Sequence, residues 1–161
     1  MLPYLKGVWE NAPIWVWSLL VVLIVIGVMA SRDRRSSAIP YFFLPLLGLL
    51  SLGSIRDLGF MPFNWVSFAL FYTLGAIWGH WLQDRLVLGK NGMRLNLAGE
   101  WWTLLVLMLI YFSNFMRGMM SVVSPETLDS LIYTLVFAAV IGAASGSFLG
   151  RGLAILRMGR R

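Results

Sequence analysis

The sequence contains no cysteine and a single histidine among its 161 residues. Without cysteine it forms neither a disulfide nor a thiolate metal site, and one histidine cannot supply the usual ligands of zinc or copper. The glycine-rich phosphate loops, dinucleotide fingerprints and nucleophile elbows of soluble enzymes are also missing. The sequence therefore predicts no metal site and no cofactor, and it weighs against catalysis without excluding it.

Charge is scarce as well. Charged residues make up 12% of the chain and hydrophobic residues 59%, whereas an average soluble domain is about 25% charged. A soluble domain of this length could not bury so much apolar surface, so we expect an integral membrane protein. The net charge of +6 does not indicate nucleic acid, because the basic residues stand at the ends of apolar runs, where they determine topology.

Long apolar runs predict an all-α fold, a polytopic bundle of five transmembrane helices in a single domain. Helices are expected because in lipid they satisfy every backbone polar group. The expected spans cover residues 14–30, 38–55, 63–82, 101–117 and 127–150. The second run contains Pro40 and Pro45 and is short, so a re-entrant loop is the alternative there.

The basic residues predict the topology. Of the 13 Lys and Arg residues, only Lys6, Arg56 and Arg117 fall on one predicted side of the membrane, and all the others fall on the opposite side. Since Lys and Arg concentrate in cytoplasmic loops, we expect the N-terminus outside and the C-terminus in the cytoplasm.

Residues 85–97, between the third and fourth spans, predict a cytoplasmic β-hairpin. Asn91-Gly92 favours a tight turn because both residue types tolerate a positive φ. Met93, Leu95 and Leu97 alternate with polar residues, which is the pattern of a strand with one buried face.

Small residues indicate where two helices pack. Gly142, Gly146 and Gly150 are four residues apart and share one helix face, and Gly75 and Gly79 do the same in the third span. Such faces allow backbones to approach closely in lipid. We expect the fifth span to pack against the third through these glycines.

Few polar residues are candidates for a site. His80 and Asp84 lie one helical turn apart near the cytoplasmic end of the third span. They fit an ordinary interfacial ion pair, or a proton relay, since histidine titrates near neutral pH. Glu100, Asn114 and Arg117 complete the candidate polar site.

Arg117 stands near the outer end of the fourth span. Its side chain can extend to the membrane surface, or it can face inward and bind an anionic head group or an acid such as Asp57 or Asp129. His80 is expected near the other surface, and the apolar core of a bilayer is about 30 Å thick. The two residues therefore cannot share one small substrate.

The segment Gly99-Glu100-Trp101 leads into the fourth span, and Ala12-Pro13-Ile14-Trp15-Val16-Trp17 opens the first. With the hairpin, these motifs resemble a family of small, uncharacterised five-span proteins of the bacterial inner membrane. The resemblance implies that fold, topology and location, and no activity. The chain departs from the family at Glu100, where a small residue is usual, and at Asn114, where a basic one is usual.

Three functions follow from these features. The first is a non-catalytic membrane component whose partners are membrane lipids, another membrane protein or a second copy of the chain. The second is a small transporter or carrier subunit, although internal repeats and a midplane site are not evident. The third is a membrane enzyme, for which His80 is the obvious acid–base candidate.

Overall fold

The computed structural model describes residues 14–37, 52–53, 55–56, 62–91 and 94–158. Most of the second predicted span, residues 38–55, lies outside these ranges.

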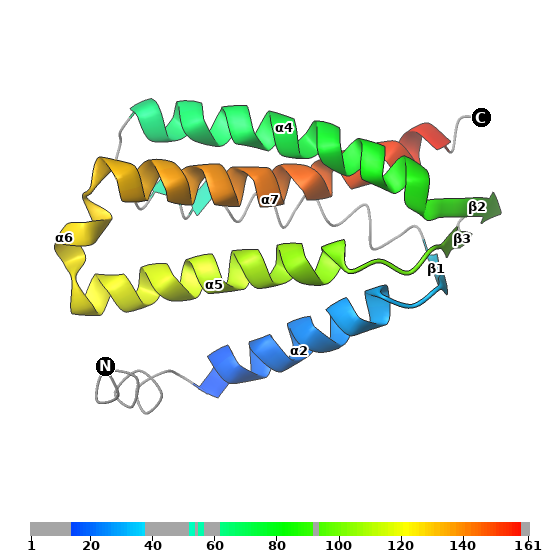
Figure 1. Cartoon of the computed structure of the whole chain (residues 1–161), viewed down its shortest axis with the longest axis horizontal. Coiled ribbons are helices and arrows are strands. Elements are labelled where there is room, and N and C mark those ends of the chain that lie inside the picture. The colour runs from blue at the N-terminus through cyan, green and yellow to red at the C-terminus, as the bar shows by residue number, and fades with distance from the viewer. Residues whose placement is uncertain (1–13, 38–51, 54, 57–61, 92–93, 159–161) are drawn as a thin grey trace.

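Long helices dominate the described part of the chain, as predicted. They are α2 (Ile14–Ala30), α4 (Pro62–Leu86), α5 (Trp102–Val123) and α7 (Leu131–Met158), with the short helix α6 (Pro125–Leu128) between α5 and α7. They lie beside one another in the order α2, α5, α7, α4 (Figure 1). Among the described helices, α5 and α7 combine the length and hydropathy needed to cross a membrane, and α2 is a shorter apolar helix of 17 residues.

The helices α2, α4 and α7 run in one direction and α5 runs in the other (Figure 1). The contacts between α2 and α5 show this arrangement, because the Tyr111 hydroxyl donates to the Val16 carbonyl at 3.2 Å while Gly27 lies against Leu104. The bundle therefore has two distinct ends. We call them the sheet end, where α2 and α4 finish, and the α6 end, where α5 finishes.

A three-stranded antiparallel sheet in the order β1-β3-β2 stands at the sheet end. Strands β2 (Val87–Asn91) and β3 (Arg94–Leu97) form the predicted hairpin. The hairpin begins two residues later than expected, because Arg85 and Leu86 still belong to α4. Leu95 and Leu97 are buried against Ile155 of α7, so the alternating pattern identified the buried face correctly.

The strand β1 (Arg34–Ser37) was not predicted. Its sequence, Arg-Arg-Ser-Ser, contains no apolar residue to alternate with the polar ones. It pairs with β3 through backbone hydrogen bonds, with Arg35 opposite Asn96. The strand therefore depends on a partner that is distant in the sequence, and its own residues show no pattern that predicts a strand.

The last helix differs from the predicted span 127–150. Pro125 opens the separate helix α6, so α7 begins later, at Leu131. At the other end α7 continues through Gly150 and Arg151 to Met158, and both of these residues are buried. Arg151, which lies beyond the predicted span, is therefore an interior residue of α7.

The small-residue faces of α4 and α7 lie directly against each other. A Cβ atom added at Gly146 would collide with the backbone carbonyl of Tyr72, and one at Gly79 would collide with that of Ser147. The same close approach occurs at Gly75, Gly142 and Gly150. Since Gly75 faces Ala143 and Gly79 faces Ser147, the two helices run parallel in one register with almost no side chain between their backbones.

Candidate functional site

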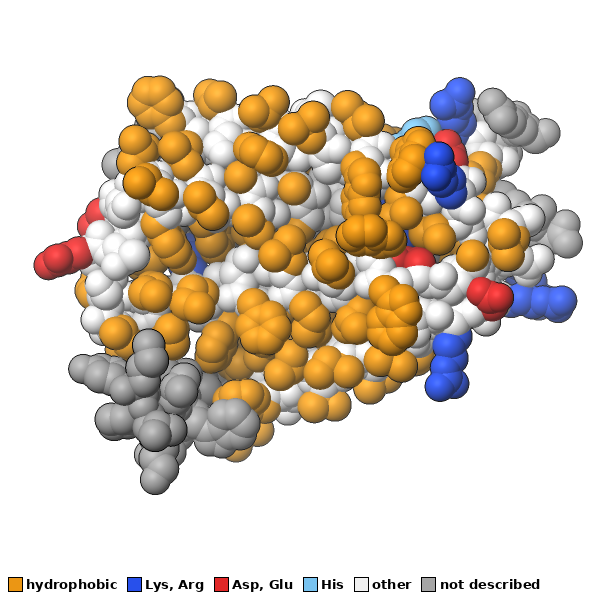
Figure 2. Space-filling model, in the orientation of Figure 1, with side chains coloured by type: hydrophobic (Ala, Val, Ile, Leu, Met, Phe, Trp, Pro, Cys, Tyr) orange, Lys and Arg blue, Asp and Glu red, His pale blue; other side chains and the backbone are white. Residues whose placement is uncertain are grey.

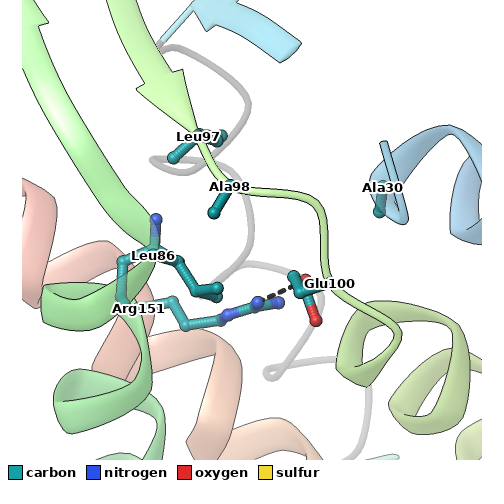
Figure 3. Close-up of a pocket in the computed structure, with 7 residues that line it drawn as sticks. Ala30, Leu86, Leu97, Ala98, Glu100 and Arg151 are labelled. Carbon is teal, nitrogen blue, oxygen red and sulfur yellow. Dashed lines mark hydrogen bonds and ion pairs between the residues drawn. The ribbon is translucent and has the colours of Figure 1, made fainter. Parts of the chain in front are cut away.

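The most buried charged residues of the described chain form an ion pair at the sheet end. Arg151 projects from α7, and Glu100 lies in the connection between β3 and α5. The Arg151 Nη2 and Glu100 Oε1 atoms are 2.6 Å apart, and the two side chains are only 5% and 10% exposed. Figure 3 shows the guanidinium reaching across from α7 to the Glu100 carboxylate.

Thr103 connects both charges. Its backbone N–H donates to Glu100 Oε2 at 2.9 Å, and its hydroxyl bonds with Glu100 Oε1. The Arg151 Nη1 atom donates to the Thr103 hydroxyl oxygen at 2.8 Å. The carboxylate thus also satisfies a free N–H in the first turn of α5, where a negative charge complements the helix dipole.

Backbone hydrogen bonds fix the connection that carries Glu100. The Glu100 N–H donates to the Ala30 carbonyl, and the Ala98 N–H donates to the Leu86 carbonyl, both at 2.9 Å. The Gly99 N–H donates to Asp33 Oδ1 at 2.6 Å. A Cβ atom at Gly99 would overlap the Ser31 backbone, so glycine is required there. The ends of α2, α4, α5 and α7 therefore meet around this one carboxylate.

The environment lowers the pKa of Glu100 from its ordinary value of 4.5. Burial is the largest single influence and acts in the opposite direction, because it disfavours the charged form. The nearby Arg151 charge and the hydrogen bonds from Thr103 and Arg151 together outweigh burial. Glu100 is therefore ionised at neutral pH and forms a true ion pair.

A small cavity of about 10 Å³ adjoins the ion pair. Ala30, Leu86 and Leu97 enclose it together with Gln83, as the labelled hydrophobic residues in Figure 3 show. The Gln83 side chain is 1% exposed, and its amide has no hydrogen-bond partner within the described residues. This volume is comparable to one water molecule, so the cavity has no room for an organic substrate. We call Gln83, Glu100, Thr103 and Arg151 the Glu100–Arg151 cluster.

His80 and Asp84 form a separate pair on α4. His80 Nε2 and Asp84 Oδ2 are 3.6 Å apart, with side chains 30% and 46% exposed. Neither residue lines the cavity beside Arg151. Next to them, the Arg85 guanidinium lies 3.7 Å from the centre of the Trp81 ring. This arrangement is that of a partly solvated helix end.

The other two predicted site residues lie far along α5, toward the α6 end. The Asn114 side-chain amide donates to the Ile110 carbonyl of its own helix at 2.9 Å. Arg117 follows one turn later on the same helix. The structure therefore brings His80 to Asp84 and Glu100 to Arg151, and it separates Asn114 and Arg117 from both pairs.

Arg151 is the site residue that sequence reasoning missed, since the topology prediction uses it only as one of the basic residues of the cytoplasmic side. The helical spacing of small and apolar residues continues past Arg151, and this pattern could have placed Arg151 inside the helix. Ser147, Arg151 and Ile155 are four residues apart and are all buried, so they share the packed face of α7. A charge on such a face needs a partner of opposite sign.

The chain matches no known protein family, no curated protein and no solved structure. The resemblance noted from its sequence therefore rests on the short motifs at the entries to the first and fourth spans.

Proposed function

We propose that this chain is a non-catalytic integral membrane protein with five membrane-spanning helices, which binds lipids or other membrane proteins. The observation that carries the proposal is the apolar surface of the long helices. Ile14 is 84% exposed, Val66 66%, Val122 83% and Ile132 76%, one on each of α2, α4, α5 and α7. Figure 2 shows hydrophobic side chains along the length of the helices and charged side chains toward the two ends.

The chain path supports a fifth crossing. Ser37 pairs with Arg94 at the sheet end. Ile55 is fully buried against Phe68 and Phe137, in the halves of α4 and α7 nearer the α6 end. Residues 37 and 55 therefore lie toward opposite ends of the bundle. This placement agrees with a crossing by the predicted span 38–55.

The charges support an orientation with the sheet end in the cytoplasm. Exposed cations gather there, and they include Arg32, Arg35, Arg85, Arg94 and Arg157. The α6 end carries the exposed acids Glu126 and Asp129 and, among the described residues, fewer cations, Arg56 and Arg117. Because Lys and Arg concentrate on the cytoplasmic side, the N-terminus lies outside and the C-terminus lies inside. The resembled family places this arrangement in the bacterial inner membrane.

A binding role suits the polar groups better than catalysis. In the Glu100–Arg151 cluster the two charges form an ion pair with each other, and the adjoining cavity measures about 10 Å³. His80 pairs with Asp84 on a partly exposed helix end, away from that cavity. The large remaining surface is apolar, and such a surface fits acyl chains, another membrane protein or a second copy of the chain.

Two measurements test the proposal. Alkaline carbonate should leave the protein in the membrane pellet, because integral proteins resist extraction. In this cysteine-free chain, Asn11→Cys and Asp129→Cys should react with an impermeant maleimide in intact cells, and Met158→Cys should react only after lysis. Release by carbonate would contradict membrane integration. Labelling of all three cysteines in intact cells would contradict the five-span topology.

A further inference from the structure

A groove of about 300 Å³ runs along one face of α2 toward the sheet end. All of its described lining residues come from α2 and the residues that follow it: Ile24, Val25, Val28, Met29 and Arg32. Ile24 and Val28 are four residues apart, and so are Val25 and Met29, so these four share one face of α2, and Arg32 follows two residues after the helix ends at Ala30. The described lining of the groove is therefore the open apolar surface of one helix with a cation at its end.

This face is separate from the one that packs against α5. The buried residues of α2 are Val16, Gly27 and Ala30, and Gly27 lies directly against Leu104 of α5. The apolar residues of the groove remain open, from 38% exposed at Val28 to 59% at Met29. The groove is thus available to an occupant that offers apolar surface.

The charges at the mouth of the groove favour an anionic occupant. Arg32 is exposed, and so is Arg35, three residues later in β1. Asp33 between them is exposed as well and accepts the Gly99 N–H at 2.6 Å, so two exposed cations stand beside one carboxylate among these described side chains. Basic pockets at the cytoplasmic ends of membrane helices bind the head groups of anionic lipids.

We propose that this groove binds one anionic phospholipid, with an acyl chain along Ile24, Val28 and Met29 and the phosphate beside Arg32. The inference rests on the proposed function, which places α2 in the bilayer with its sheet end at the cytoplasmic surface. The helix rises about 9 Å from Ile24 to its last residue, Ala30, at 1.5 Å per residue, and Arg32 follows two residues later. That length accommodates the upper part of an acyl chain below a head group held at Arg32.

The charge is tested by titrating the detergent-purified chain with phosphatidylglycerol or phosphatidylcholine of identical acyl chains, read by native mass spectrometry. One cation near a membrane surface contributes a preference of about fivefold for an anionic lipid. Arg32→Gln should therefore weaken phosphatidylglycerol binding about fivefold and leave phosphatidylcholine unchanged. The control is Arg157→Gln, which removes an exposed cation of α7 outside the groove and should leave both lipids unchanged.

The shape is tested by filling the groove. Val28→Trp should weaken binding of both lipids, whereas Leu153→Trp, at an exposed apolar position of α7, should weaken neither. If Val28→Trp lowers the melting temperature, Val25→Phe provides a smaller obstruction at the same face. Equal weakening by Arg32→Gln and Arg157→Gln would overturn the site, since the charge effect would then be diffuse. A change of oligomeric mass in Val28→Trp would assign the groove to a second copy instead.

The failure of this inference is distinguishable from that of the proposed function. If the wild-type chain resists carbonate while its Arg32→Gln variant binds lipid as well as the wild type, only the groove assignment fails. If carbonate releases the wild-type chain, the membrane proposal and the lipid site fail together.

Discussion

Separating the two charges of the Glu100–Arg151 pair should strongly destabilise the fold. Glu100→Gln leaves a guanidinium that is 5% exposed without its counter-charge, and Arg151→Met leaves a carboxylate that is 10% exposed. Removal of one partner of a buried pair destabilises by about 3–5 kcal/mol, because the remaining charge stays buried. A surface ion pair contributes only about 0–1 kcal/mol.

The double variant Glu100→Gln/Arg151→Met separates the pairing from the general effect of substitution. Replacing both charges removes both desolvation penalties, and such replacements are often neutral or stabilising. We therefore expect the double variant to be more stable than either single variant by about 2 kcal/mol or more. In a pair without coupling, the two losses would simply add.

Unfolding in mixed micelles with increasing sodium dodecyl sulfate, followed by tryptophan fluorescence, measures these free energies. His80→Gln is the matched control, because it breaks the partly exposed pair with Asp84 and should change stability by less than about 1 kcal/mol. Single variants at Glu100 and Arg151 that lose no more than this control would refute the reasoning. Strictly additive losses in the double variant would refute it as well.

Three further predictions follow from the same structure. The pKa of Glu100 is lower in the folded chain than its ordinary value of 4.5, so ionisation of Glu100 stabilises the fold above that pH. This stabilisation disappears as the pH falls through the lower pKa of the folded chain. The melting temperature of the wild type should therefore drop in acid, and that of Glu100→Gln should drop less. Gly146→Leu should destabilise by about 3 kcal/mol or more, since its side chain would strike the Tyr72 backbone; if the variant unfolds normally but changes oligomeric state, the face lies between subunits. Gln83→Leu should be neutral or stabilise by about 1 kcal/mol, because it removes a buried amide without a protein partner in the described chain; a loss above 1 kcal/mol, measured in the same micelles, would contradict this.

Local patterns were sufficient for most of the helical architecture. The apolar run at residues 14–30 coincides with α2, and the Asn91-Gly92 sequence signal with the alternation of Leu95 and Leu97 located the strands of the hairpin. Each of these signals is contained within a short stretch, where the periodicity or a turn residue reflects the local geometry directly. They could therefore be recognised without knowledge of the rest of the chain.

The pairings across the chain could not be predicted in this way. The strand β1 exists because β3 lies beside it, and Arg35 is about sixty residues from its partner Asn96. Arg151 is 51 residues from Glu100, and a basic residue near the end of an apolar run has the same sequence signature whether it is solvated or buried. Tertiary contacts decided both cases.

The separation of Glu100 from Arg151 has a consequence for biogenesis. A ribosome completes Glu100 51 residues before it adds Arg151, and domains generally form from the N-terminus as synthesis proceeds. Until α7 arrives, Thr103 is the one partner already made among the described partners of the carboxylate, and its donors are neutral. Burial of the carboxylate without Arg151 is unfavourable. We therefore expect the sheet end to close last, so that a nascent chain truncated before Arg151 keeps an open, polar end that a membrane quality-control protease can recognise.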